Sequence, residues 1–340
     1  MLGLGRSGTD VAVDLGSTLT RVVTADPPSF AELHSVLVMQ EDAEGRRATG
    51  FGEQARQLLG RTSSGTKVVQ PIRGGAVEEF EAAELLLAHV IGLVERARQR
   101  SPRLLLPIRT DATEVERRAL QELGRAAGAR EVRLVQAPLA AALGAQLPIS
   151  GPTGSMVVDV GGGRTDVAVL ALGGLVIRRS IKVAGETLDA RIAQWLRREH
   201  GLVVPPSTAE RIKVEVGAAR PTDRVVQTRI RGRDLSTGAP KVLDVHGGHV
   251  AEAIAEPIER IRATVLEVLR ELPPELSADV LASGVMLVGG ASQLRLLDRV
   301  LAEATGLAFL HADRPSACTA LGLQRLLADP QLLDSATATA

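Results

Sequence analysis

Residues 157–169, VVDVGGGRTDVAV, place an aspartate and three consecutive glycines between two apolar runs. The valines before the glycines are typical of the end of a buried strand, and residues 167–169 of the start of the next, which predicts a hairpin. Glycines allow positive φ and carry no side chain, so consecutive N–H groups can converge on an anion, while a carboxylate at a strand end can hold a metal ion through water. The stretch alone fits either a plain hairpin tip or a loop that binds phosphate and magnesium.

The composition is that of an ordinary globular protein. The chain has 340 residues, 45% of them hydrophobic, so it can bury a large core, and its length predicts about two domains. Lysine plus arginine and aspartate plus glutamate both number 40, which gives no overall basic field and argues against nucleic acid as a partner.

Three further features indicate a cytoplasmic location. The single cysteine, Cys318, excludes a disulfide framework, and the amino terminus lacks the apolar segment of a signal peptide. No uninterrupted apolar run reaches the roughly 20 residues needed to span a bilayer. Contact with a membrane, if there is any, is therefore expected to be peripheral.

The opening pattern occurs a second time near the amino terminus. Residues 10–25, DVAVDLGSTLTRVVTA, repeat the order of apolar strand, acid, glycine, small hydroxyl residues and apolar strand. Asp14 and Asp159 therefore occupy equivalent places in two halves of the chain. Each half alternates strands with helices and carries one insertion, which predicts an α/β protein of two domains that face each other across a cleft.

The pattern also gives domain limits. We expect domain I at 9–149, with an inserted small subdomain at about 31–74. We expect domain II at 150–328, with its own inserted small subdomain at about 184–250. A disordered tail is expected at 329–340. The helices are expected at 77–100, 111–128, 184–201 and about 251–272, and a buried strand at 103–108.

A third glycine cluster lies in residues 285–306, where a strand leads into Gly289, Gly290, Ala291 and Ser292 and then an amphipathic helix. This order brings the backbone close to a flat ligand at the start of a helix, although a tight turn is the alternative. Three such clusters in a duplicated α/β chain fit one nucleotide held between two lobes.

These clusters resemble the motifs of the actin, Hsp70 and sugar-kinase superfamily of ATPases. DLGSTLTRV and DVGGGRTDVAV are similar to its two phosphate motifs, and VMLVGGAS is similar to its adenosine motif. Within the superfamily, DATEVERRALQELGRAAGAREVRLV, TAERIKVEVGAA and IRGRDLSTGAP resemble MreB and Mbl, the bacterial actins. The similarity covers roughly residues 10–327 and implies an actin-like fold with a nucleotide cleft.

The resemblance also implies a site for ATP, or ADP, with Mg²⁺. Asp14 and Asp159 would hold the metal through water. The phosphates would contact Gly16, Ser17, Thr18, Gly161, Gly162 and Gly163. The ribose would contact Glu210 and Lys213, and the adenine would contact Gly289, Gly290, Ala291 and Ser292. For Glu210 and Lys213 the alternative is a surface ion pair.

The chain departs from the family at a catalytic position. MreB proteins usually read EEPMAAA where this chain has QAPLAAALGA at 136–145, so Ala137 replaces the glutamate that positions or activates the attacking water. Gln136 is the remaining candidate, but a shift of one residue turns a side chain by about 100° in a helix or 180° in a strand. We therefore expect ATP binding with slow hydrolysis.

A second departure is Arg164, which replaces a residue that is usually small and polar. It either pairs with a phosphate or points outward into solvent, and we expect the latter. A third concerns the membrane, because MreB proteins commonly bind the inner leaflet through an amino-terminal amphipathic helix or an apolar loop. Here that loop is RARQRSPR, at 96–103, without an apolar wedge, and only its arginines offer electrostatic contact with headgroups.

The resemblance implies a cytoskeletal protein that binds ATP and assembles into filaments for cell shape and cell-wall synthesis. Its partners would be itself and membrane proteins of wall synthesis, in the cytoplasm or at the inner face of the membrane. Two alternatives are a degenerate actin-like scaffold that binds nucleotide without polymerising and a small-molecule kinase of the same superfamily.

Overall fold

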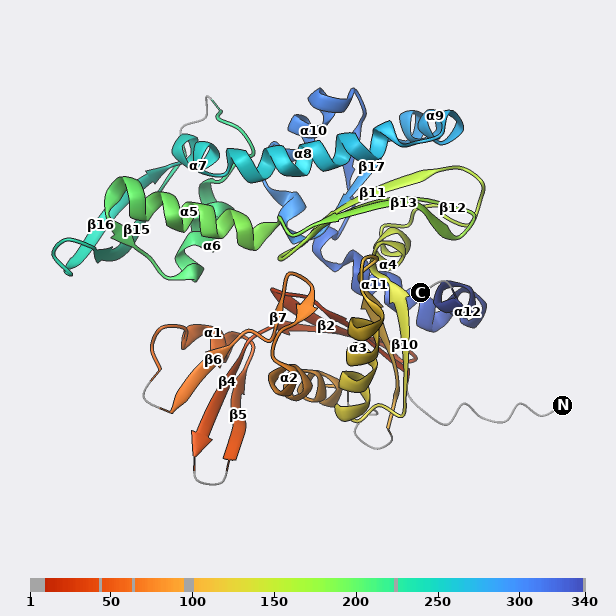
Figure 1. Ribbon diagram of the computed structural model, residues 1–340, viewed down its shortest axis with the longest axis horizontal. Helices are drawn as coiled ribbons and strands as arrows, with labels where there is room; N and C mark the ends of the chain where they lie inside the picture. Colours follow the sequence, from red (N-terminus) through yellow and green to blue (C-terminus); the bar gives the residue numbers. More distant parts are fainter. Residues whose placement is uncertain (1–9, 43–44, 63–64, 95–100, 223–225, 339–340) are drawn as a thin grey trace. The chain divides into compact units, whose positions relative to one another are not determined.

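The computed structural model describes residues 10–42, 45–62, 65–94, 101–222 and 226–338 (Figure 1). The chain divides into two compact units. Unit 1 comprises Met1–Gly151, Leu172–Gly174 and Ala317–Ala340, and unit 2 comprises Pro152–Ala171 and Leu175–Ser316.

Unit 1 is built on a five-stranded sheet in the order β10-β9-β1-β2-β3. Strand β1 (Asp10–Leu15) pairs antiparallel with β2 (Leu19–Ala25), which pairs with β3 (Pro28–His34). On its other side β1 runs parallel to β9 (Arg103–Ile108), and β9 runs parallel to β10 (Glu131–Gln136). The carboxyl ends of β1, β9 and β10 therefore lie at one edge of the sheet.

Two helices cover this sheet through a shared core. Helix α2 (Phe80–Gly92) contributes Leu86 and Leu87, and α3 (Glu114–Ala126) contributes Leu123, to a cluster with Val11 and Val13 of β1. Thr113 begins α3 with a capping box, in which its hydroxyl accepts from the Glu116 amide. Helix α2 ends at Gly92, earlier than the expected position 100, and residues 95–100 lie outside the described part of the chain.

Smaller elements of unit 1 lie within residues 37–77. Strands β4 (Leu37–Asp42), β5 (Gly45–Phe51) and β6 (Thr66–Val69) form a three-stranded sheet, with α1 (Glu53–Gln57) beside it. A two-stranded ribbon of β7 (Ile72–Arg73) and β8 (Ala76–Val77) follows.

The segment from residue 317 returns to unit 1, whereas the sequence assigned it to domain II as far as residue 328. Helix α11 (Cys318–Ala328) packs on α4 (Ala137–Gly144) at a distance that only glycine permits. A Cβ on Gly322 would lie 1.7 Å from the Ala140 carbonyl oxygen, and one on Gly144 would lie 1.8 Å from the Cys318 carbonyl oxygen. Sequence periodicity alone does not reveal such a contact.

The expected disordered tail forms a helix instead, α12 (Pro330–Ala338). The Asp329 side chain begins it by accepting from the amides of Gln331 at 3.0 Å and Leu332 at 3.1 Å. Arg133 of β10 holds it through an ion pair of 2.8 Å with Asp334 and a hydrogen bond to Thr337. The tail is therefore anchored by its cap and by Arg133.

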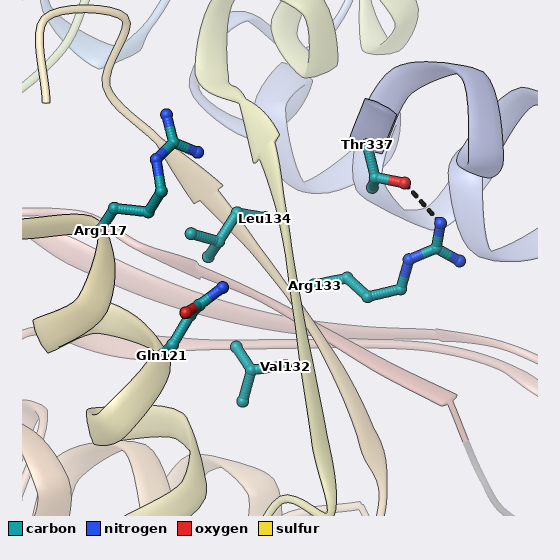
Figure 2. Close-up of a pocket in the computed structure, with 6 residues that line it drawn as sticks. All are labelled: Arg117, Gln121, Val132, Arg133, Leu134 and Thr337. Carbon is teal, nitrogen blue, oxygen red and sulfur yellow. Dashed lines mark hydrogen bonds between the residues drawn. The ribbon is translucent and has the colours of Figure 1, made fainter. Parts of the chain in front are cut away.

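A hollow of about 250 Å³ lies beside this helix (Figure 2). Figure 2 shows Val132 and Leu134 on the side of β10 that faces α3, and Arg133 on the side that faces α12. The full lining is Arg117, Gln121, Val132, Arg133, Leu134 and Thr337. None of the residues predicted to bind nucleotide lines this hollow.

Unit 2 repeats the sheet of unit 1. Its order is β13-β12-β11-β17-β18, from β11 (Ser155–Val160), β12 (Thr165–Ala171), β13 (Gly174–Ile181), β17 (Val285–Val288) and β18 (Phe309–His311). Strands β11, β17 and β18 are parallel, and β12 is antiparallel to β11. The central strand β11 thus corresponds to β1, and the predicted duplication is confirmed.

Helices and a second small sheet complete unit 2. The helices are α5 (Gly185–His200), α6 (Pro206–Val216), α9 (Pro274–Ser283) and α10 (Leu297–Thr305), and the small sheet contains β14 (Leu202–Val203), β15 (Gln227–Asp234) and β16 (Pro240–His246). The helix expected near 251–272 is two helices, α7 (Gly247–Ala253) and α8 (Ala255–Arg270). Pro257 explains the break, because it cannot donate to the carbonyl of Ala253.

Candidate functional site

Asp14 lies at the carboxyl end of the central strand of unit 1, directly opposite Arg21 on β2. Arg21 Nη1 is 3.6 Å from Asp14 Oδ2, and the exposed fractions of the two side chains are 7% and 16%. Burial raises the pKa of Asp14, and the positive charge of Arg21 opposes that rise. A largely buried carboxylate whose ionisation is only partly supported by its neighbour is suited to binding a further cation.

The first glycine loop follows at once. A Cβ on Gly16 would lie 2.6 Å from the Leu19 carbonyl oxygen, so this turn requires glycine. The Ser17 hydroxyl accepts from the Gly75 amide at 3.1 Å, which leaves its own hydrogen for another acceptor. The N–H groups of Ser17 and Thr18 donate to no other described residue. The loop thus offers backbone donors beside Asp14.

The second glycine loop is held against the start of α5 by backbone hydrogen bonds. The carbonyls of Gly161 and Gly162 accept from the amides of Gly185 at 3.1 Å and Glu186 at 2.7 Å. Within the described residues the N–H groups of Gly162 and Gly163 donate to nothing. Consecutive unused amides form a concave anion site, so this geometry fits a phosphate.

Arg164 does not point into solvent, and that expectation was wrong. Only 6% of the residue is exposed, and its Nε and Nη2 donate to Ser180 Oγ at 3.0 and 2.6 Å. Ser180 in turn donates to Asp166. A buried guanidinium needs acceptors and a counter-charge. Ser180 of β13 supplies an acceptor for Nε and Nη2, and Asp166 of β12 supplies a negative charge that reaches Arg164 through the Ser180 hydroxyl.

The third cluster lies against the metal candidate of unit 2. Gly289 has φ +87°, and a Cβ there would lie 2.3 Å from Asp159 Oδ1 and 2.4 Å from the Val160 carbonyl oxygen. Ser292 is fully buried, and its hydroxyl donates to the Gly289 carbonyl at 2.7 Å. Ser292 therefore holds the turn, while Gly290 is exposed and Ala291 half-buried.

Lys213 pairs with a residue that sequence reasoning missed. Its Nζ donates to Asp189 Oδ2 at 2.9 Å and to the Gly185 carbonyl at 3.1 Å, and the Lys213 side chain is only 13% exposed. The alternative of an exposed surface pair therefore does not describe Lys213. Glu210, one turn earlier on α6, is half-buried.

Gly185 is the junction of the parts in unit 2. A Cβ there would lie 3.3 Å from Lys213 Nζ and 3.4 Å from both the Gly161 carbonyl oxygen and the Ala291 Cβ. The second loop, the lysine of α6 and the third cluster therefore meet around one glycine. In the sequence, only the spacing of Gly185 and Asp189 pointed to this arrangement, because it places the two residues one helical turn apart at the start of α5.

Asp189 gives a pH prediction. Burial raises its pKa to about 6 from 3.8, Lys213 lowers it and Glu210 adds to the rise. Because the folded protein then holds this proton more tightly than the unfolded chain, raising the pH destabilises the fold. Relative to Asp189→Asn, the wild type should lose up to about 3 kcal/mol of unfolding free energy between about pH 4 and pH 7.

The measurement is chemical denaturation of both proteins across that pH range. The asparagine variant lacks the titrating group, so the difference between the two curves isolates Asp189. A difference that does not change with pH would show that Asp189 ionises in the fold as it does in the unfolded chain.

Gln136 and Ala137 lie at the same sheet edge as Asp14. Gln136 ends β10, and Ala137 is the first residue of α4, whose first turn holds no acidic residue. Both residues are half-buried. Unit 1 therefore has no carboxylate at residues 136 and 137.

The described residues contain neither a direct metal site nor a membrane-spanning helix. No group of three or more histidine, cysteine, aspartate or glutamate side chains there is arranged to hold a metal ion directly. No helix in the described ranges has the length and apolar character needed to cross a membrane.

Comparison with known proteins gives one consistent result. A family model described as MreB/Mbl protein matches residues 8–335. The chain is 39% identical over 322 residues to the cell shape-determining protein MreB of Escherichia coli K12, covering 94% of this chain and 93% of that protein.

Solved structures agree with this match. The crystal structure of MreB 5 of Spiroplasma citri bound to AMPPNP superposes with a TM-score of 0.90 at 26% identity, covering 97% of this chain and 98% of that one. The MamK double helical filament has the same fold, with a TM-score of 0.78 at 21% identity and coverage of 95% and 99%.

Proposed function

The chain belongs to the MreB/Mbl family, and we propose that it is a cell-shape protein of the bacterial actin type. It binds ATP, or ADP, together with Mg²⁺ and assembles into filaments of its own copies. The observation that carries the proposal is the repeated arrangement of an aspartate at the end of a central strand followed by a glycine loop, Asp14 with residues 16–18 and Asp159 with residues 161–163.

The residues fit these roles as follows. The amides of Ser17, Thr18, Gly162 and Gly163, which donate to no other group among the described residues, donate to phosphate oxygens. Lys213, held by Asp189, and Glu210 face the ribose, and the backbone of 289–292 lines the adenine. Asp14 and Asp159 would hold Mg²⁺ through water, and the bound metal would neutralise phosphate charge.

We expect the rate of ATP hydrolysis to be low. Loss of a group that orients or activates water costs about 10² to 10⁴ in rate, and Ala137 has no such group. This feature favours the second candidate, an actin-like scaffold that binds nucleotide without polymerising. The match along nearly the whole chain to a cell shape-determining protein favours the first.

The location proposed is the cytoplasm, including the inner face of the membrane, where membrane proteins of wall synthesis would be partners. The arginines of the loop at 96–103 would supply any peripheral contact. Residues 95–100, which carry most of that proposal, lie outside the described residues.

The test is assembly. Purified protein should sediment, and show filaments by electron microscopy, when ATP and Mg²⁺ are added. The Asp159→Ala variant should lose the increase in ATP affinity that Mg²⁺ gives the wild type, because the water-mediated hold on the metal is removed. A wild type that binds ATP but stays monomeric at high concentration would select the scaffold. An Asp159→Ala variant whose ATP affinity in a calorimetric titration rises with Mg²⁺ as much as that of the wild type would reject the site.

A further inference from the structure

The second glycine loop carries its own buried positive charge. Arg164 directly follows Gly163, and its guanidinium is fixed by two hydrogen bonds to Ser180, which donates to Asp166. The residue is 6% exposed, so water does little to screen this charge. A cation is thus built into the hairpin that carries the phosphate-binding amides.

That charge belongs to the same hairpin as the metal candidate, Asp159. Asp166 is the direct cross-strand partner of Asp159 in the β11–β12 pair, and residues so placed have Cβ atoms about 4.5–5.5 Å apart. Two carboxylates at this separation repel each other, and partial burial strengthens the repulsion. With Asp159, Asp166 and Arg164, two negative charges and one positive charge, the hairpin has a local net charge of minus one.

In unit 1 the charge of the aspartate assigned to the metal is compensated by a different residue. There the cross-strand partner of the aspartate is itself the arginine, since Arg21 stands opposite Asp14 at 3.6 Å. Arg21 also contacts Glu32 at 3.1 Å, so its charge is shared between two carboxylates. Each aspartate assigned to the metal is therefore accompanied by a buried arginine, and the compensation in unit 2 comes from the loop.

We propose that Arg164 is an internal counter-cation that supplies part of the charge neutralisation provided by Mg²⁺, so that this protein binds ATP with little dependence on divalent metal. The inference rests on the proposed nucleotide site. A triphosphate that approaches two carboxylates is repelled unless a cation lies among them. Here Arg164 remains in place when the metal is removed.

The experiment is calorimetric titration of ATP into the wild type, once with Mg²⁺ and once with EDTA. The quantity compared is the ratio of the two dissociation constants. The wild-type ratio should be below about tenfold, and the Arg164→Gln variant should raise it at least about tenfold, mainly by weakening binding in EDTA. A wild-type ratio above about a hundredfold, or an unchanged ratio in the variant, would overturn the proposal.

Matched variants separate charge from folding. Arg164→Lys keeps the charge and should keep the low ratio. The double variant Arg164→Gln with Asp166→Asn returns the local net charge to minus one and should restore the low ratio of dissociation constants. A merely structural role of Arg164 would not produce that recovery. Arg179→Gln removes an exposed arginine, 46% accessible, from β13 and should change nothing.

Arg21→Gln should raise the ratio less than Arg164→Gln does, because Glu32 already shares the charge of Arg21. An effect confined to Arg21 would contradict the assignment to Arg164. If the wild type fails to bind ATP even with Mg²⁺, the proposed nucleotide site itself is wrong, and that result is distinct from a large ratio.

Discussion

An Ala137→Glu variant is expected to hydrolyse bound ATP at least about ten times faster than the wild type in a single turnover. Ala137 is the first residue of α4 and follows the carboxyl end of β10, the sheet edge at which Asp14 also lies. A glutamate there would supply the water-orienting carboxylate that the resemblance of QAPLAAALGA to the MreB motif implies is missing from this chain. A tenfold gain corresponds to about 1.4 kcal/mol of barrier.

The affinity for ATP should change little in this variant. The phosphates are held by the amides of the glycine loops, which the substitution does not touch. Measuring binding and single-turnover hydrolysis in parallel therefore distinguishes a missing catalytic group from a damaged site. Filaments of the variant should also turn over faster than those of the wild type.

The matched control is Gln136→Glu, which places a carboxylate one residue earlier. Gln136 is the last residue of β10, with extended backbone angles, so its side chain leaves the chain in a different direction from that of Ala137. It should not accelerate hydrolysis. Rapid hydrolysis by the wild type, or an inactive Ala137→Glu variant that still binds ATP, would mean that Gln136 or another residue orients the water.

Local patterns in the sequence were enough to place both aspartates. The apolar runs on either side of each aspartate predicted the two hairpins, and the glycines after each aspartate predicted the loops. The environment of Arg164 was not accessible in the same way, because its partner Ser180 lies on the next strand and the pairing depends on how that strand folds back. Likewise, the contact of Ser17 with Gly75 joins residues 58 positions apart.

The carboxyl-terminal segment shows the same limit. Asp329 followed by Pro330 is a readable start signal for a helix, and the structure uses it. What the sequence could not show is which unit receives α11. That depends on Gly144 and Gly322, each of which packs against backbone atoms of the other helix although the two helices are far apart in the chain. The residues around a glycine in an apolar helix do not indicate which helix it packs against.

Gly322→Ala should therefore destabilise unit 1 by about 2–3 kcal/mol or more. Alanine is favoured over glycine in a helix interior by about 1 kcal/mol, so propensity alone predicts the opposite sign. The added Cβ would lie 1.7 Å from the Ala140 carbonyl oxygen and 2.9 Å from the Gly144 amide nitrogen. Because both are backbone atoms, no rotamer change relieves the clash, and α11 must move away from α4.

The measurement is chemical denaturation followed by circular dichroism, with Gly248→Ala as the matched control. Gly248 lies in α7, and a Cβ there meets nothing within 4 Å, so that variant should be unchanged or gain up to about 1 kcal/mol. Displacement of α11 would also draw Arg325 from the Leu143 carbonyl, which it now reaches at 2.7 Å at the end of α4. Since α4 begins at Ala137, Gly322→Ala should also reduce the gain from Ala137→Glu when the two are combined. Equal stability of Gly322→Ala and the wild type would mean that the two helices can separate at no cost, and the close contact would then not be what joins residues 317–340 to unit 1.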